Sequence, residues 1–173
     1  VYQAMYQSDR AEVLIAAGLV SEGQAALAAA AQAHAQRGLR QFQGEVELAL
    51  ARSLLLTDPA DAVRRARQAA RRFRARGSES WALRADVVEV MGRVADGARD
   101  DRLLARTRDL VVALSEQGLV REEKVTRMHV ARLHIRRGEL GEAAAVLATV
   151  TLKPDESVTT RLLHRELRAD LAR

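Results

Sequence analysis

Apolar residues recur along the chain at steps of three and four, the spacing of one face of an α-helix. The clearest stripe comprises Leu83, Val87, Val90, Met91 and Val94. A similar stripe runs from Leu103 to Leu114. No segment shows the two-residue alternation of a half-buried β-strand. The pattern therefore predicts an all-α protein.

Glycines end these apolar segments at nearly constant intervals. One series is Gly38, Gly77 and Gly118, with steps of 39 and 41 residues. The other is Gly18, Thr57 in place of a glycine, Gly97 and Gly138, with steps of 39, 40 and 41 residues. Glycine suits the left-handed conformation that commonly follows the end of a helix. Two interleaved series with one period predict a helical hairpin of about 40 residues repeated about four times, which is an α-solenoid.

The predicted helices form a single repeat domain over residues 1–173. The hairpins are expected roughly at 3–38, 40–77, 78–118 and 121–150, with a trailing helix at 155–173. Connections of two to five residues make consecutive helices antiparallel neighbours. Helix starts carry their own signals: Ser21 and Gln24 form a capping box, and Asp58 can cap a helix whose first residue is Pro59. Because the chain begins at Val1 and ends within the last predicted helix, we interpret it as an excerpt of a larger protein.

One turn carries a family resemblance. The segment Gly138–Ala143, followed by Leu147, resembles the centre of a tetratricopeptide repeat. Gly18–Leu27 and Thr57–Ala66 fit the same frame, with Gly23 and Ala62 at its small position. The period of about 40 residues exceeds the 34 of the standard repeat, and the Trp and Tyr of its first helix and its closing Pro are absent. The resemblance implies a divergent, longer relative of this repeat.

Two further segments resemble a more particular group. Arg10–Leu19, and Arg76–Gly77 followed by Trp81–Arg84, are similar to the helical-repeat arms of bacterial proteins that end in a CHAT domain, a caspase-like protease module. This resemblance implies that a protease and its catalytic residues lie beyond Arg173. Repeat regions of bacterial transcription regulators are similar too, so that alternative stays open.

Composition narrows the classes of protein further. The chain has no cysteine, which excludes disulfides and thiolate chemistry. Its longest unbroken apolar run, Ala25–Ala31, is too short for a membrane span. We therefore expect a bacterial cytoplasmic protein that does not bind membranes. Of its 28 basic residues, only Lys124 and Lys153 are not arginine.

The strongest local charge lies on the predicted fourth helix. This basic patch comprises Arg64, Arg65, Arg67, Arg71, Arg72, Arg74 and Arg76. With the two acids of Asp58–Gly77, the segment has a net charge of 7 − 2 = +5, equal to that of the whole chain. One interpretation is an ordinary solvated outer face. The other is an electrostatic docking site for nucleic acid, an acidic partner or an acidic neighbouring domain.

A second candidate surface lies along the first helices of the hairpins, where tetratricopeptide folds usually bind ligands. The expected partner-binding groove comprises Glu45, Arg52, Asp86, Glu89, Arg93, Arg132 and Arg136. The alternative is an exposed face whose charges form salt bridges with one another.

Catalytic chemistry is not indicated. The four histidines, His34, His129, His134 and His164, lack metal-ligand spacing. Asp100 and Asp101 are adjacent acids, but they begin a helix, where carboxylates are expected. No nucleophile is paired with a base, so we expect no enzyme activity in this chain and no cofactor or metal.

The sequence thus favours a protein–protein interaction or sensing scaffold, the repeat arm of a multidomain bacterial protein with a downstream caspase-like protease. Its partner would be a protein, a peptide or another domain of the same protein. The alternative is a nucleic-acid-associated regulatory module, such as a transcription-regulator repeat domain, that uses the basic helix Arg64–Arg76. Apolar residues of the trailing helix, Leu162 and Leu163 among them, also suggest self-association through that helix.

Overall fold

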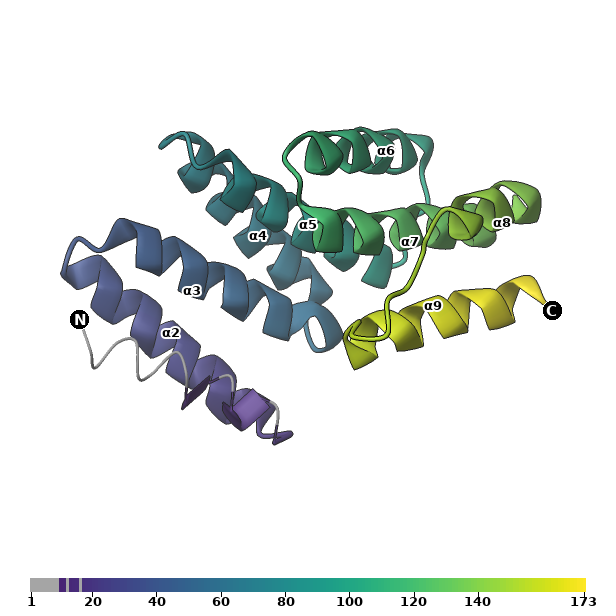
Figure 1. Ribbon diagram of the computed structural model, residues 1–173. Coiled ribbons are helices and arrows are strands. Elements are labelled where there is room, and N and C mark those ends of the chain that lie inside the picture. The colour runs from purple at the N-terminus through teal and green to yellow at the C-terminus, as the bar shows by residue number, and fades with distance from the viewer. Residues whose placement is uncertain (1–9, 12, 16) are drawn as a thin grey trace. The chain divides into compact units, whose positions relative to one another are not determined.

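The computed structural model describes residues 10–11, 13–15 and 17–173 (Figure 1). Within these residues the protein is all-α and contains no β-strand. The chain divides between Asp96 and Gly97 into two compact units. The boundary falls inside the expected hairpin 78–118, and the single continuous repeat domain stays a prediction.

Unit 1 is a series of consecutive antiparallel helices. Its elements are α2 (Val20–Gln36), α3 (Arg40–Ser53), the short 3₁₀ helix η1 (Leu54–Leu56), α4 (Pro59–Arg74) and α5 (Glu79–Ala95). Each helix packs against the next along the chain, and α3 also contacts α5. Sequential packing of this kind is consistent with a helical array.

Unit 2 is arranged around one central helix. Its elements are α6 (Asp101–Glu116), α7 (Val120–Arg136), α8 (Leu140–Ala148) and α9 (Val158–Leu171). Helix α7 packs against each of the other three. The connection between α8 and α9, residues 149–157, is longer than the two to five residues expected, because α8 ends at Ala148 rather than near 150 and α9 begins at Val158 rather than near 155.

Most predicted helix ends agree with the structure to within about two residues. Asp58 caps α4 as predicted: its carboxylate accepts a hydrogen bond from the Asp61 amide at 2.9 Å. The capping box at Ser21 is wrong, because α2 begins one residue earlier, at Val20, and has no side-chain cap. The start of the first predicted helix, near Gln3, lies outside the described residues, although 10–11 and 13–15 are helical.

One turn geometry recurs at the helix ends. After α6, the Gly118 amide donates to the Ser115 carbonyl at 3.0 Å and the Leu119 amide donates to the Leu114 carbonyl at 2.9 Å. This pair of bonds is a Schellman motif, and Gly118 adopts the φ of +66° that it requires. The same pair of bonds and a positive φ occur at Gly18, Gly38, Gly77 and Gly138. The residue that follows each of these glycines starts the next helix with φ near −85° and ψ near 63°.

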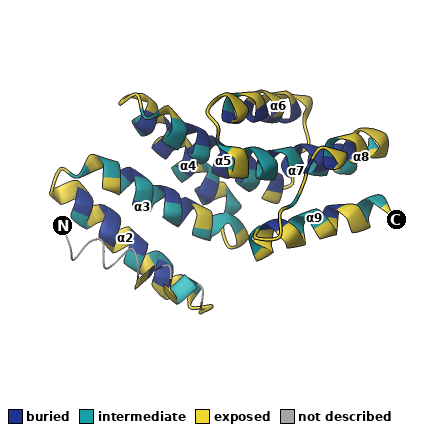
Figure 2. Ribbon diagram, in the orientation of Figure 1, coloured by how far each residue is buried: buried dark blue, intermediate teal, exposed yellow. Residues whose placement is uncertain are grey.

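Small residues bring the helices of unit 1 close together. The buried face of α4 consists of Ala62, Ala66, Ala69, Ala70 and Phe73 (Figure 2). A Cβ on Gly44 of α3 would lie 2.9 Å from the Phe73 ring, and a Cβ on Gly92 of α5 would lie 2.7 Å from Val63 Cγ2. Glycine at these two positions therefore permits contacts with α4 that a larger residue would obstruct.

Candidate binding surfaces

The arginines of α4 lie around its buried alanine face, but most of them bond to carboxylates. Arg67 Nε donates to Glu89 on α5 at 2.8 Å. Arg72 bonds to Glu47 on α3, and Arg74 bonds to Asp86 on α5. Neighbouring helices therefore neutralise much of the charge that the sequence places on α4.

Two more arginines bond within the helix. Arg64 and Arg65 share the carboxylate of Asp61, at 3.1 and 2.9 Å. Among the residues that the structure describes, no ion pair involves Arg71 or Arg76, and both residues are exposed. Two arginines, rather than seven, are thus uncompensated within the basic patch.

The carboxylates that face α4 are unusually well buried. The Glu89 side chain is 2% exposed and the Asp86 side chain is 10% exposed. A buried carboxylate is destabilising unless a cation and hydrogen bonds compensate it, and Arg67 and Arg74 supply that compensation. The hydrogen bond to Asp86 raises the pKa of Arg74.

Because of this burial, two residues of the expected groove are not on its surface. Asp86 and Glu89 lie in the interface between α4 and α5 and are not available on a surface. Glu45 accepts a 2.8 Å bond from Gln41, and Arg52 is exposed on α3. The groove residues of unit 1 that reach solvent are therefore mainly Glu45, Arg52 and the half-buried Arg93.

The remaining two groove residues belong to unit 2. Arg132 bonds to Glu166 on α9 at 2.6 Å, and Arg136 is exposed one turn further along α7. Both follow His129 along α7 and are close enough to act on it electrostatically. The two ring nitrogens of His129 are buried without a hydrogen-bond partner in the described part of the chain. Burial, assisted by the two arginines, lowers the pKa of His129 to about 3.

Two of the other histidines are buried and one is half-buried. His134 is buried and bonds through Nδ1 to Glu139 at 2.6 Å and through Nε2 to Arg108 at 3.0 Å. His34 stacks on Phe42 with ring centroids 5.6 Å apart. His164 is half-buried on α9. The residues that the structure describes contain no cluster of three metal-ligating side chains.

The Trp81–Arg84 segment has a packing role at the start of α5. Trp81 stacks on Phe73 with ring centroids 5.6 Å apart, and the Arg84 guanidinium lies 4.9 Å from the Trp81 ring centroid. Phe73 is fully buried in the α4 core and is not available to stack on nucleic-acid bases.

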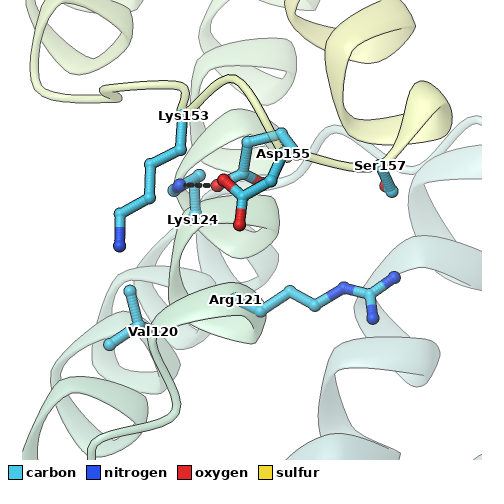
Figure 3. A pocket seen from close by; sticks show the side chains of 7 residues that line it. Val120, Arg121, Lys124, Lys153, Asp155 and Ser157 are labelled. Carbon is cyan, nitrogen blue, oxygen red and sulfur yellow. Dashed lines mark hydrogen bonds and ion pairs between the residues drawn. The ribbon is translucent and has the colours of Figure 1, made fainter.

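A pocket in unit 2, lined mainly by charged residues, was not anticipated from the sequence. Its volume is about 360 Å³, and it lies between the start of α7 and the segment before α9 (Figure 3). Its lining residues are Val120, Arg121, Lys124, Lys153, Asp155, Glu156 and Ser157. Both lysines of the chain line it, and this departure from an otherwise all-arginine basic set is the one sequence signal that could have indicated the pocket.

Comparison with known proteins identifies no relative: no family model, no curated protein and no solved structure matches the chain. None of the described helices is both long enough and apolar enough to span a membrane. What is established is an all-helical protein whose consecutive helices pack sequentially within each unit.

Proposed function

We propose that this chain is a protein–protein interaction or sensing scaffold, the tetratricopeptide-like repeat arm of a multidomain bacterial protein. The observation that carries the proposal is the glycine turn that recurs after five helices with nearly the same backbone angles. Because the same turn joins successive helices, it gives each of these helix pairs the same antiparallel arrangement. Arrays of such helix pairs present extended faces to protein partners. A cytoplasmic location and an associated caspase-like protease belong to the same proposal.

The charge distribution supports a protein partner over nucleic acid. Non-specific nucleic-acid binding depends on many uncompensated cations, because each phosphate contact releases counterions. On α4, Arg64, Arg65, Arg67, Arg72 and Arg74 are already bonded to carboxylates of unit 1. Releasing Arg67 to a phosphate would break its 2.8 Å bond to the buried Glu89 carboxylate, which is unfavourable.

Site-specific photocrosslinking in cells that produce the full-length protein from its own locus tests this proposal. A photoreactive residue replaces Arg52, on the exposed part of the expected groove, or Gln68, an exposed residue of α4 outside it. We expect Arg52 to give a discrete crosslinked protein that Gln68 does not give. Equal crosslinking at both positions, or none at Arg52, would refute the groove as the binding surface.

The nucleic-acid alternative has a separate test. Fluorescence anisotropy with labelled duplex DNA and RNA at low salt compares the native chain with the double variant Arg71→Glu, Arg76→Glu. The matched control is Arg168→Glu, on α9. We expect no saturable binding by any of the three. Binding that weakens steeply with salt, and is lost in the double variant alone, would instead favour the nucleic-acid module.

A further inference from the structure

The pocket of unit 2 has walls that are held in place by an ion pair. Lys124 on α7 bonds to Glu156, which precedes α9, and both side chains are largely shielded, at 12% and 13% exposed. Ser157 caps α9 by accepting a hydrogen bond from the Thr160 amide at 3.2 Å. The segment that carries Lys153 and Asp155 is thereby fixed between two helices. The Lys124–Glu156 pair keeps this open pocket in place, which favours ligand binding.

The ion pair leaves three charged groups in the pocket for a ligand. Arg121 and Lys153 are exposed cations, and Asp155 is an exposed carboxylate. In the part of the chain that the structure describes, none of the three side chains makes a hydrogen bond or an ion pair. Figure 3 shows Lys153 and the Arg121 guanidinium on opposite sides of Asp155.

The start of α7 adds further donors. The first intrahelical bond of α7 runs from the Glu123 amide to the Leu119 carbonyl, and Leu119 has no side chain able to cap the helix. The amides of Val120 and Arg121, two lining residues, therefore have no partner inside the helix. Amides in this position favour a negatively charged group of a ligand.

A simple anion does not match all of these groups. It would be attracted to Arg121 and Lys153 but repelled by Asp155. A ligand that satisfies all three has two negative groups and one positive group. We propose that the pocket binds a small acidic amino acid, with its two carboxylates at Arg121 and Lys153 and its ammonium group at Asp155.

The size and lining of the pocket agree with such a ligand. A volume of about 360 Å³ is at the lower end of the range for small-molecule sites, so an amino acid fits together with a few bridging waters. The planar guanidinium of Arg121 can bond a carboxylate through two parallel hydrogen bonds. Val120, 58% exposed, offers an apolar surface to the methylene groups of the ligand. This inference does not depend on the proposed protein-binding role.

The test is a titration of the full chain followed by ¹H–¹⁵N NMR, with the Val120 and Arg121 amides as reporters. The probes are L-glutamate, glutarate, which lacks the ammonium group, L-glutamine, which lacks one carboxylate, and inorganic phosphate. We expect saturable shifts with L-glutamate and binding about tenfold weaker for glutarate and glutamine, because each loses one charge-assisted contact. No saturable shift with L-glutamate, or tighter binding of phosphate, would overturn the proposal.

The most specific test is a variant that changes the preference of the pocket between L-glutamate and glutarate. Asp155→Asn removes the carboxylate that faces the ammonium group. It should weaken L-glutamate about tenfold while glutarate binds at least as tightly as to the native chain. Asp109→Asn, an exposed residue of α6 outside the pocket, is the matched control and should change neither. If Asp155→Asn leaves the ratio of the two affinities unchanged, the assignment of the ammonium site is wrong.

Discussion

Replacing Gly92 with alanine should destabilise unit 1 through a single added methyl group. A Cβ at this position would lie 2.7 Å from Val63 Cγ2 and 3.2 Å from the Pro59 carbonyl oxygen. Val63 is β-branched and on a helix, so its side chain has essentially one rotamer and cannot rotate away. The Pro59 oxygen belongs to the backbone of α4. The added methyl group can therefore be accommodated only if α4 and α5 move apart.

The expected magnitude follows from two opposing effects. Alanine is favoured over glycine in a helix by about 1 kcal/mol. Overpacking a close interface costs about 1–3 kcal/mol. The sum is a net loss of about 1 kcal/mol. Gly141 in α8 provides the matched control, because a Cβ there would meet nothing within 4 Å. Gly141→Ala should therefore be neutral or stabilise unit 2 by at most about 1 kcal/mol.

Urea denaturation followed by circular dichroism compares the two variants with the native chain. If the two units unfold in separate steps, the comparison uses the step that each substitution shifts. We expect a lower midpoint for Gly92→Ala at unchanged denaturant slope, and a midpoint for Gly141→Ala that does not fall. If Gly92→Ala stabilises the protein as much as Gly141→Ala does, the close contact between α4 and α5 is incorrect.

Three further predictions concern buried charge and the last helix. Glu89→Ala should lower the free energy of unfolding, measured by urea denaturation, by about 1–2 kcal/mol. This is less than for a fully buried pair, because the partner arginine of Glu89 is 45% exposed. Glu22→Ala, at an exposed position, should change the free energy of unfolding by no more than about 0.5 kcal/mol. The pKa of His129 is lowered from 6.5 to about 3, so the folded state favours its neutral form. The free energy of unfolding should therefore be highest above pH 6.5 and should fall as the pH falls toward 3. In denaturation curves recorded over this pH range, His129→Leu should make the fall in the free energy of unfolding smaller. Leu163 packs against the core of unit 2 whereas Leu162 is 59% exposed, so Leu163→Glu should lower the thermal midpoint, and Leu162→Glu should leave it unchanged while reducing any self-association seen by light scattering.

The helices were predictable because their signals are local. Glycine after a helix end, and Asp58 with Pro59 at a helix start, act within a few residues of one another, so the sequence alone indicates them. Ser21 failed as a cap for a local reason too: the turn at Gly18 makes Leu19 the residue that precedes α2.

The charge pairing was not predictable from the sequence. Whether Arg67 meets Glu89 depends on how far α4 and α5 are shifted along each other, and nothing in either helix alone determines that register. A helical wheel places Asp86 and Glu89 on one stripe but does not say that the stripe faces arginines. The pocket was not predictable for the same reason. Lys153 and Arg121 line one pocket only because the segment before α9 folds against α7.

Arg67, Arg72 and Arg74 of α4 bond to carboxylates of the neighbouring helices, which makes most of the basic patch structural. A double-mutant cycle on Arg74 and Asp86 tests it directly, with Arg74→Ala, Asp86→Ala and the double variant compared by urea denaturation. Arg74 donates from both terminal nitrogens toward the Asp86 carboxylate, which is 10% exposed, so we predict a coupling energy of about 1–2 kcal/mol. Strictly additive effects of the two substitutions would contradict the claim and return the arginines of α4 to the surface as a binding site.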